Sequence, residues 1–204
     1  MGVEPRIVLA SASPRRAELL RAAGFDFDVQ PARVDESVHA DEKPEQYVRR
    51  VADAKARSVL AIAGDAVVLA ADTTVVIDGQ ILGKPVDDTD ASRMLRLLSG
   101  RRHQVLTAVT LARHARVVTS IAITDVKFAP LSDDEIAWYI ATGEPFDKAG
   151  AYAVQGLASR FVARIDGSYA NVVGLPVALV YAMLRELGVI GISNTPRDRA
   201  VPPR

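Results

Sequence analysis

One apolar run in the middle of the chain constrains the fold most. The stretch "AVVLAAD" places six apolar residues directly before Asp72, a pattern typical of a central strand that is buried on both faces. The preceding stretch "KPEQYVRRVADAKARSVLAIAG" has helical spacing, with Pro44 near its start and Gly64 after its end. On this helix we expect Tyr47, Val51 and Ala54 to share the buried face and Lys55 to lie beside it.

The N-terminal part shows the same alternation of strand and helix. "RIVLA" predicts a short buried strand, and "SPRRAELLRAAG" predicts a helix. Ser13 suits the N-cap, Pro14 suits the first helical position, and Gly24 suits the position after the C-cap. The apolar stripe of this helix is predicted to comprise Ala17, Leu20 and Ala23.

The middle of the chain favours antiparallel pairs. "TVVIDGQILG" predicts a hairpin with Asp78-Gly79 at its turn, and "HQVLTAVTLAR" and "RVVTSIAITDVKFA" predict two long paired strands. The whole pattern predicts an α/β fold with a mixed central sheet flanked by helices. We expect one domain over residues 1–190 and a mobile, proline-rich tail over residues 191–204.

Composition excludes several classes of protein. Lys+Arg and Asp+Glu each number 25 of 204 residues, and only 5% of residues are aromatic. Both values argue against a nucleic-acid binder. The absence of cysteine excludes disulfides and thiolate catalysis. No apolar run reaches about 18 residues, so no membrane span is expected. The N-terminus does not resemble a secretory signal, and we expect a cytoplasmic protein.

Several familiar catalytic motifs are missing. The chain has no G-x-x-x-x-G-K-[ST] P-loop, no G-x-G-x-x-G after a strand, no H-E-x-x-H and no G-x-S-x-G. Its histidines, His39, His103 and His114, lack the spacing of metal ligands, and we expect surface or hydrogen-bonded side chains. A Ser-His-Asp hydrolase is therefore not indicated.

The first strand–helix junction suits an anion. Ser11, Ser13, Arg15 and Arg16 lie at a strand end and in the first turn of a helix, where N–H groups are free and the helix dipole favours negative charge. Arginine forks also match phosphate oxygens. This junction predicts a phosphate cradle. The alternative is that Ser13 only caps the helix and both arginines are solvated.

Two acidic positions suggest a reaction centre. Asp72 is expected to emerge at the carboxyl end of a central strand, the side where α/β sheets bind ligands. It could polarise a water, or bind a hard divalent cation together with Glu36 of "RVDES". The alternatives are a turn or cap at Asp72 and a solvated loop carboxylate at Glu36.

Further candidates lie on basic and polar segments. Lys84 in "LGKP" could neutralise a phosphate, although exposed lysines commonly have no such role. The loop "EPFDKAGAYAVQG" offers four candidates for substrate contact: Glu144, Asp147, Lys148 and Gln155. The alternative is a structural loop in which Asp147 and Lys148 form an internal ion pair.

Seven motifs in order resemble one family. "LASASPRR", "VDE", the lysine motif around Lys55, "ADTTVVIDGQILGKP", "LSGRRHQVLTAV", "EPFDKAGAYAVQG" and "IDGSYANVVGLP" together resemble the Maf family of nucleoside triphosphate pyrophosphatases, over about residues 7–187. The resemblance implies a two-lobed α/β fold with a cleft, similar to the inosine triphosphate pyrophosphatases. It also implies hydrolysis to monophosphate and pyrophosphate, a divalent metal (Mg²⁺ or Mn²⁺) and a homodimer. The "ADT" triplet resembles the branch acting on dTTP and UTP.

The resemblance also implies roles for eight residues: phosphate binding by Ser11, Arg15 and Arg16, an acidic metal-side role for Glu36, motif lysines at Lys55 and Lys84, a general base at Asp72, and a substrate contact at Gln155. Catalysis would then involve Asp72 with Glu36, Lys55 and Lys84. We also expect Ser13 and Thr73 to bind substrate, and Asp72 to contact the metal together with Glu36. The chain departs from the family at Ala153, where glycine is common. The alternative function is a non-catalytic nucleotide-binding regulator that acts through a protein partner, for example in cell division. The paired acids Glu36 and Asp72 favour the enzyme.

Overall fold

A computed structural model describes residues 5–190, and the predicted mobile tail lies outside these residues. The strands are β1 (Ile7–Leu9), β2 (Phe27–Val29), β3 (Val67–Ile77), β4 (Gln80–Leu82), β5 (Arg102–Arg113), β6 (Arg116–Phe128) and β7 (Val162–Asp166). The α-helices are α1 (Pro14–Ala22), α2 (Pro44–Leu60), α3 (Asp88–Leu98), α4 (Asp133–Ala141), α5 (Tyr169–Val173) and α6 (Val177–Glu186). Three short 3₁₀ helices are η1 (Glu144–Asp147), η2 (Ala149–Ala151) and η3 (Leu157–Phe161).

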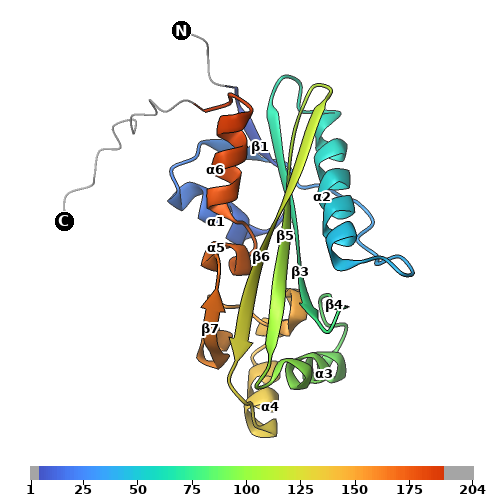
Figure 1. Ribbon diagram of the computed structural model, residues 1–204, viewed down its shortest axis with the longest axis vertical. Helices are drawn as coiled ribbons and strands as arrows, with labels where there is room; N and C mark the ends of the chain where they lie inside the picture. Colours follow the sequence, from blue (N-terminus) through green and yellow to red (C-terminus); the bar gives the residue numbers. More distant parts are fainter. Residues whose placement is uncertain (1–4, 191–204) are drawn as a thin grey trace, which may run out of the picture.

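The strands form one mixed sheet in the order β2-β1-β3-β5-β6-β7, with β4 paired to β3. The pairs β1–β2 and β1–β3 are parallel, whereas β3, β5, β6 and β7 pair in antiparallel fashion. The sheet is elongated, with α2 on one face and α1 and α6 on the other (Figure 1). The predicted α/β fold with a mixed, helix-flanked sheet is confirmed.

Separate apolar clusters divide the molecule into two lobes. In the upper lobe of Figure 1, α1 and α6 pack on one face of the sheet through residues such as Leu20 and Leu184, and α2 covers the other face. In the lower lobe, α3 and α4 pack on the far ends of the long strands through residues such as Leu95 and Tyr139. The predicted two-lobed arrangement is confirmed, because the upper and lower lobes have separate apolar clusters. The long strands β3, β5 and β6 run through both lobes and connect them.

The central strand β3 is longer than predicted. It was expected to end at Asp72, but it continues to Ile77, and Asp72 lies in its middle opposite Ala108 of β5. The β-branched residues after Asp72 favour strand, and the pairing with β5 continues through Val76. The hairpin from β3 to β4 turns at Asp78-Gly79 as predicted, with positive φ at both residues.

Where β3 was predicted to end, the sheet instead has a gap along one edge of this strand. One edge of β3 pairs with β5 over nearly its whole length. On the other edge, β1 pairs only with residues 67–69 and β4 only with residues 75–77. Residues 70–74 therefore have no strand partner on that edge. This gap lies at the carboxyl end of β1, so Asp72 still reaches the ligand side of the parallel part of the sheet.

Helix α1 corrects two details of the sequence analysis. Ser13 occupies the N-cap, but its side chain makes no capping hydrogen bond. Its backbone N–H instead donates to Ser11 Oγ at 3.2 Å, so Ser11 organises this turn. Ala23 is exposed rather than part of the apolar stripe, because the helix ends at Ala22 and Gly24 turns the chain away with φ +81°.

Candidate functional site

A cleft of about 510 Å³ lies at the gap in the sheet, between the two lobes. It brings together all ten residues predicted to bind substrate, bind metal or take part in catalysis: Ser11, Ser13, Arg15, Arg16, Glu36, Lys55, Asp72, Thr73, Lys84 and Gln155. These residues come from widely separated parts of the sequence, from Ser11 to Gln155. Their placement supports a common site, whereas their individual roles stay predictions.

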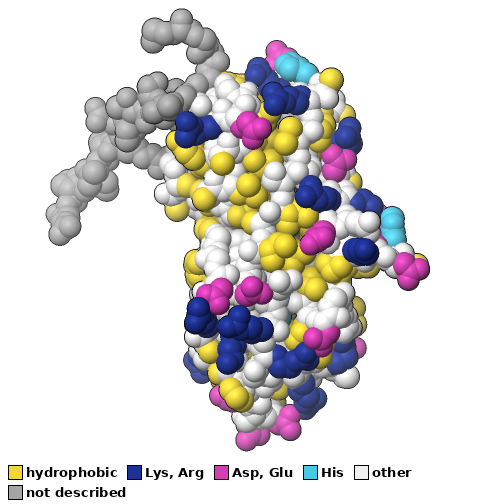
Figure 2. All heavy atoms as spheres, viewed as in Figure 1, with side chains coloured by type: hydrophobic (Ala, Val, Ile, Leu, Met, Phe, Trp, Pro, Cys, Tyr) yellow, Lys and Arg dark blue, Asp and Glu magenta, His cyan; other side chains and the backbone are white. Residues whose placement is uncertain are grey.

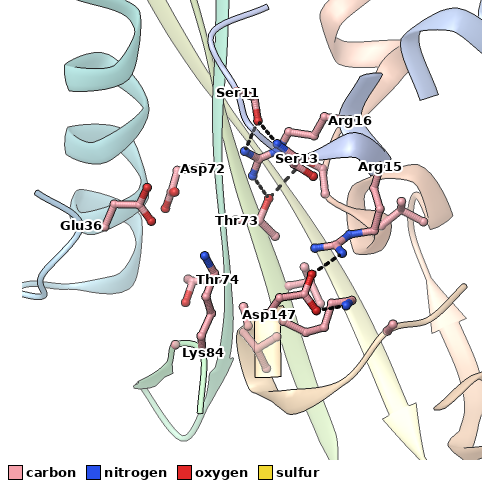
Figure 3. A pocket seen from close by; sticks show the side chains of 18 of the residues that line it. Ser11, Ser13, Arg15, Arg16, Glu36, Asp72, Thr73, Thr74, Lys84 and Asp147 are labelled. Carbon is pink, nitrogen blue, oxygen red and sulfur yellow. Dashed lines mark hydrogen bonds and ion pairs between the residues drawn. The ribbon is translucent and has the colours of Figure 1, made fainter. Parts of the chain in front are cut away.

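The two faces of β3 present different side chains to this cleft. Because side chains alternate along a strand, Asp72 and Thr74 point to the face covered by α2, which we call the α2 face. Thr73 points to the opposite face, where it meets Arg16 of α1, and we call this the α1 face. The gap in the sheet connects the two faces, so a ligand in the cleft can contact both (Figure 3).

On the α2 face, Lys55 bridges two carboxylates. Its Nζ lies 2.8 Å from Asp72 Oδ1 and 2.8 Å from Glu36 Oε1. Lys55 was expected beside the buried face of α2, but it lies within that face, whereas Ala54 is only half-buried. The hydrogen-bonded carboxylate of Asp72 explains this, because a buried ammonium requires a charged partner. The pairing joins residues from β3, α2 and the loop before α2.

The surrounding charges keep Glu36 ionised. Burial disfavours its charged form, but the hydrogen bond and charge of Lys55, with the charges of Lys84 and Arg16, outweigh burial and lower the pKa of Glu36 below its ordinary value. Tyr47 on α2 supports the same loop, because its hydroxyl donates to the Glu36 carbonyl oxygen at 3.1 Å. Burial and the nearby carboxylates raise the pKa of Tyr47, so it remains a neutral donor.

Two oxygen atoms on the α2 face remain without partners. Asp72 Oδ2 and Thr74 Oγ1 are buried, and neither finds a hydrogen-bond partner among residues 5–190. Both side chains line the cleft, next to Lys84 (Figure 3). Sequence reasoning missed Thr74, although its position two residues after Asp72 places it on the same face. Two unsatisfied hydrogen-bonding groups therefore belong to residues of the cleft wall.

On the α1 face, the side chains of Arg16 and Thr73 are both hydrogen-bonded. Arg16 donates from Nε to the Gly174 carbonyl oxygen at 2.8 Å, from Nη1 to Ser11 Oγ at 3.2 Å, and from Nη2 to Thr73 Oγ1 at 3.0 Å. Burial lowers the pKa of Arg16, and the carboxylates of Asp72 and Glu36 oppose this shift. The guanidinium is thus fixed in orientation, and two of its five N–H groups stay available for an anion.

A buried polar network supports Arg16 from below. Thr73 Oγ1 lies 2.9 Å from Thr107 Oγ1 and 3.3 Å from the Gly174 carbonyl oxygen. Asn171 of α5 is fully buried and donates from Nδ2 to the Val105 carbonyl oxygen at 3.0 Å. Helix α5 thereby fixes the Gly174 carbonyl that holds Arg16. This segment is part of the motif "IDGSYANVVGLP", for which no helix was predicted.

Arg15 contacts the loop "EPFDKAGAYAVQG" on the other side of the cleft. Its Nη1 lies 3.1 Å from Asp147 Oδ2, and Asp147 also pairs with Lys148. The internal ion pair that was left open for this loop is therefore present. Burial opposes ionisation of Asp147, but the bonds from Lys148 and Arg15 prevail and lower its pKa. Because Asp147 is largely exposed, the contact with Arg15 forms a weak closure at the mouth of the cleft.

The candidate Glu144 does not line the cleft. Its carboxylate accepts hydrogen bonds from the Tyr139 hydroxyl at 2.8 Å and from Leu157 N at 3.0 Å, so it shapes the loop and is not a substrate contact.

Ala153, the departure from the family pattern, is buried and lines the cleft. Its N–H donates to the Tyr139 hydroxyl at 3.2 Å, and its φ is not positive, so alanine fits without strain.

Lys84 and Gln155 complete the cleft from its exposed rim. The 3₁₀ helix η2, which lies between Lys84 and Gln155 in the sequence, packs closely against β3. Its Gly150 has φ +68°, and a Cβ there would lie 2.8 Å from Val75 of β3. Only glycine lets η2 approach β3 so closely.

Charged side chains of both signs are interspersed over the face of the molecule in Figure 2. Attraction of an anion therefore depends on the local cations of the cleft and not on the net charge of zero.

Comparisons with known proteins agree with these observations. A family model described as "Maf-like protein" matches residues 6–187. A protein of Anaeromyxobacter dehalogenans named dTTP/UTP pyrophosphatase is 54% identical over 188 residues, which cover 90% of this chain and 95% of that protein. A protein of the same name from Koribacter versatilis is 52% identical over 184 residues, with 90% and 95% covered.

Solved structures support the fold. The Ham1 protein of Staphylococcus aureus aligns with a TM-score of 0.51 and 15% identity, and that of Coxiella burnetii with 0.52 and 16%. Each alignment covers 89% of this chain and 99% of the other. At these identities the likeness concerns the fold alone. Among the helices that the structure describes, none is long and apolar enough to span a membrane.

Proposed function

Because the chain belongs to the Maf family, as its motifs predicted, we propose that it hydrolyses dTTP and UTP to the nucleoside monophosphate and pyrophosphate. The names of its relatives support this reaction. The observation that carries the proposal is the pairing of a Lys55-bridged acid pair with a fixed arginine across one cleft. The cleft volume of about 510 Å³ is within the ordinary range for a small-molecule site.

The basic residues suit a triphosphate. Arg16 is held by three hydrogen bonds, so it offers its remaining N–H groups without losing further side-chain freedom on binding. The first-turn N–H groups of α1 have no acceptor within the helix, and its dipole favours an anion there. Arg15 and Lys84 add positive charge from opposite sides of the cleft. Together they neutralise the charge that would otherwise repel the Asp72 and Glu36 carboxylates.

The α2 face suits the reaction step. Water attacks the α-phosphorus, and its oxygen forms a new O–P bond while its proton passes to Asp72. The bond from the α-phosphorus to the α,β-bridging oxygen breaks, and pyrophosphate leaves with the electron pair. Lys55 holds Asp72 by Oδ1, which leaves Oδ2 directed at the cleft. The fixed cations stabilise the charge that develops on the phosphate oxygens.

The acid pair also fits a hard divalent cation, Mg²⁺ or Mn²⁺. Asp72 Oδ2 is buried without a partner in the described part of the chain, and Glu36 is half-exposed beside it. Among residues 5–190, no group of three or more His, Cys, Asp or Glu side chains is placed to hold a metal. Glu36 and Asp72 would therefore bind the cation together with substrate phosphates and water, the manner typical of Mg²⁺. When bound, the cation would lower the pKa of its water and neutralise phosphate charge.

A panel assay tests the proposed reaction. Pyrophosphate release is measured for all common and several modified nucleoside triphosphates, with Mg²⁺ and with Mn²⁺, and with chelator as the control. We expect the highest rates with dTTP and UTP and no release in chelator. Binding of nucleotide without pyrophosphate release from any substrate would contradict the enzyme and favour the regulator that acts through a partner.

Two further expectations belong to this proposal. The family resemblance implies a homodimer, and the composition suits the cytoplasm. Sedimentation equilibrium of the purified chain would show twice the monomer mass of 21.9 kDa if the dimer forms. A monomer at all concentrations that support activity would remove the dimer from the proposal and leave the reaction intact.

A further inference from the structure

Thr74 differs from the other buried threonines. Four threonine side chains are almost fully buried: Thr74, Thr107, Thr110 and Thr124. The last three have hydrogen-bond partners, whereas Thr74 Oγ1 has none among the described residues. A buried hydroxyl without a partner is unfavourable, and valine, which follows twice in the same strand, would fill a similar volume without that disadvantage. The strand packing therefore gives no reason for a hydroxyl at this position.

The cleft supplies such a reason. Thr74 lines it, and so does Asp72. Among the residues that the structure describes, Asp72 Oδ2 is the other buried oxygen on the α2 face without a partner. Residues two apart on one face of a strand have Cα atoms about 6.6 Å apart. Two hydrogen bonds through one water oxygen span up to about 5.6 Å, so side chains that lean slightly toward each other can share a single water.

The chemistry of the two groups is complementary. An ionised carboxylate only accepts hydrogen bonds, whereas a threonine hydroxyl can donate one. A water between them would donate a hydrogen bond to Asp72 Oδ2 and accept one from the Thr74 hydroxyl. These two bonds would fix the direction of the remaining lone pair of the water. We propose that Thr74, together with Asp72 Oδ2, positions the water that attacks the α-phosphorus. This inference rests on the proposed function.

The test compares substitutions at Thr74 with a matched control. Thr74→Val removes the hydroxyl and keeps the shape, Thr74→Ser restores the hydroxyl, and Thr110→Val removes a partnered hydroxyl on the same face of the sheet. We expect Thr74→Val to lower kcat roughly 10- to 100-fold, since misplaced reactants lose rates of this order. KM should stay within about twofold, because nucleotide binding does not use the hydroxyl. Thr74→Ser should recover most of kcat, and Thr110→Val should keep it.

Stability provides a second readout. Because the Thr74 hydroxyl has no partner within residues 5–190, Thr74→Val should leave the melting temperature unchanged or raise it. A lower melting temperature in Thr74→Val would indicate a structural role and overturn the inference. Wild-type kcat in Thr74→Val, or an equal loss in Thr110→Val, would also overturn it and leave the proposed function standing. Absence of pyrophosphate release from the wild-type protein would instead contradict the proposed function itself.

Discussion

The two faces of β3 at the cleft differ in how completely their polar groups are satisfied. On the α1 face, Arg16 and Thr73 are held by hydrogen bonds that lead back to Gly174 and Thr107. On the α2 face, Lys55 bridges two carboxylates, but Asp72 Oδ2 and Thr74 Oγ1 have no partner among the described residues. Neighbouring residues of one strand thus belong to two different environments.

This difference indicates a division of labour. A cation whose bonds are already made binds an anion with little reorganisation, so the α1 face suits phosphate binding. Oxygens without partners are unfavourable when buried, and they become satisfied when water, metal or substrate enters. The α2 face therefore suits the reacting groups. Substitutions on the α2 face should affect turnover, and substitutions on the α1 face should affect binding.

The largest effect is expected for Asp72→Asn. Asparagine keeps the shape but cannot take the proton of the attacking water, so kcat should fall about 1000-fold, within the range for loss of a general base. Nucleotide binding, measured by calorimetry, should persist. Asp53→Asn on the exposed side of α2 provides the control and should behave like the wild-type protein. Wild-type turnover in Asp72→Asn would remove Asp72 from the mechanism and end the distinction between the faces.

A smaller effect is expected for Arg16→Lys. Lysine keeps the charge but cannot reach Gly174, Ser11 and Thr73 at once. Loss of such charged hydrogen bonds should raise KM for dTTP roughly 10- to 100-fold, with a smaller change in kcat. Arg49→Lys, at an exposed arginine of α2, is the control. If kcat falls and KM does not change, the α1 face takes part in the reaction step and the comparison fails.

The smallest effect is expected at the mouth of the cleft. Asp147→Asn removes the charge that holds Arg15 and so frees a cation for the substrate. An exposed pair contributes up to about 1 kcal/mol, so KM should fall by up to about fivefold. The gain should shrink at high salt. Asp133→Asn breaks an exposed pair with Arg96 away from the cleft and serves as the control. A higher KM in Asp147→Asn would show instead that Asp147 supports substrate binding.

Much of the fold could be predicted because local chemistry determines it. The turn at Asp78-Gly79 and the long paired strands that follow each depend on residues close in sequence. The site residues were identified through ordered motifs, and the structure places them in one cleft. Their roles stay predictions, because proximity alone does not distinguish binding from catalysis.

The remaining features depend on contacts between distant residues. The continuation of β3 past Asp72 follows from its pairing with β5, where Asp72 lies opposite Ala108, and no local sequence pattern reveals this distant pairing. Once that register is known, alternation separates Asp72 and Thr74 from Thr73. Glu144 was a candidate because its loop is polar, but its acceptors are used by Tyr139 and Leu157, and those contacts become visible only in three dimensions.

The position of water attack tests the central claim most directly. The wild-type protein is incubated with dTTP in water labelled with ¹⁸O, and the products are analysed by mass spectrometry. If the α2 face directs water to the α-phosphorus, the label appears in the monophosphate and the pyrophosphate remains unlabelled. Label in pyrophosphate or in orthophosphate would place the attack at another phosphorus and contradict the account.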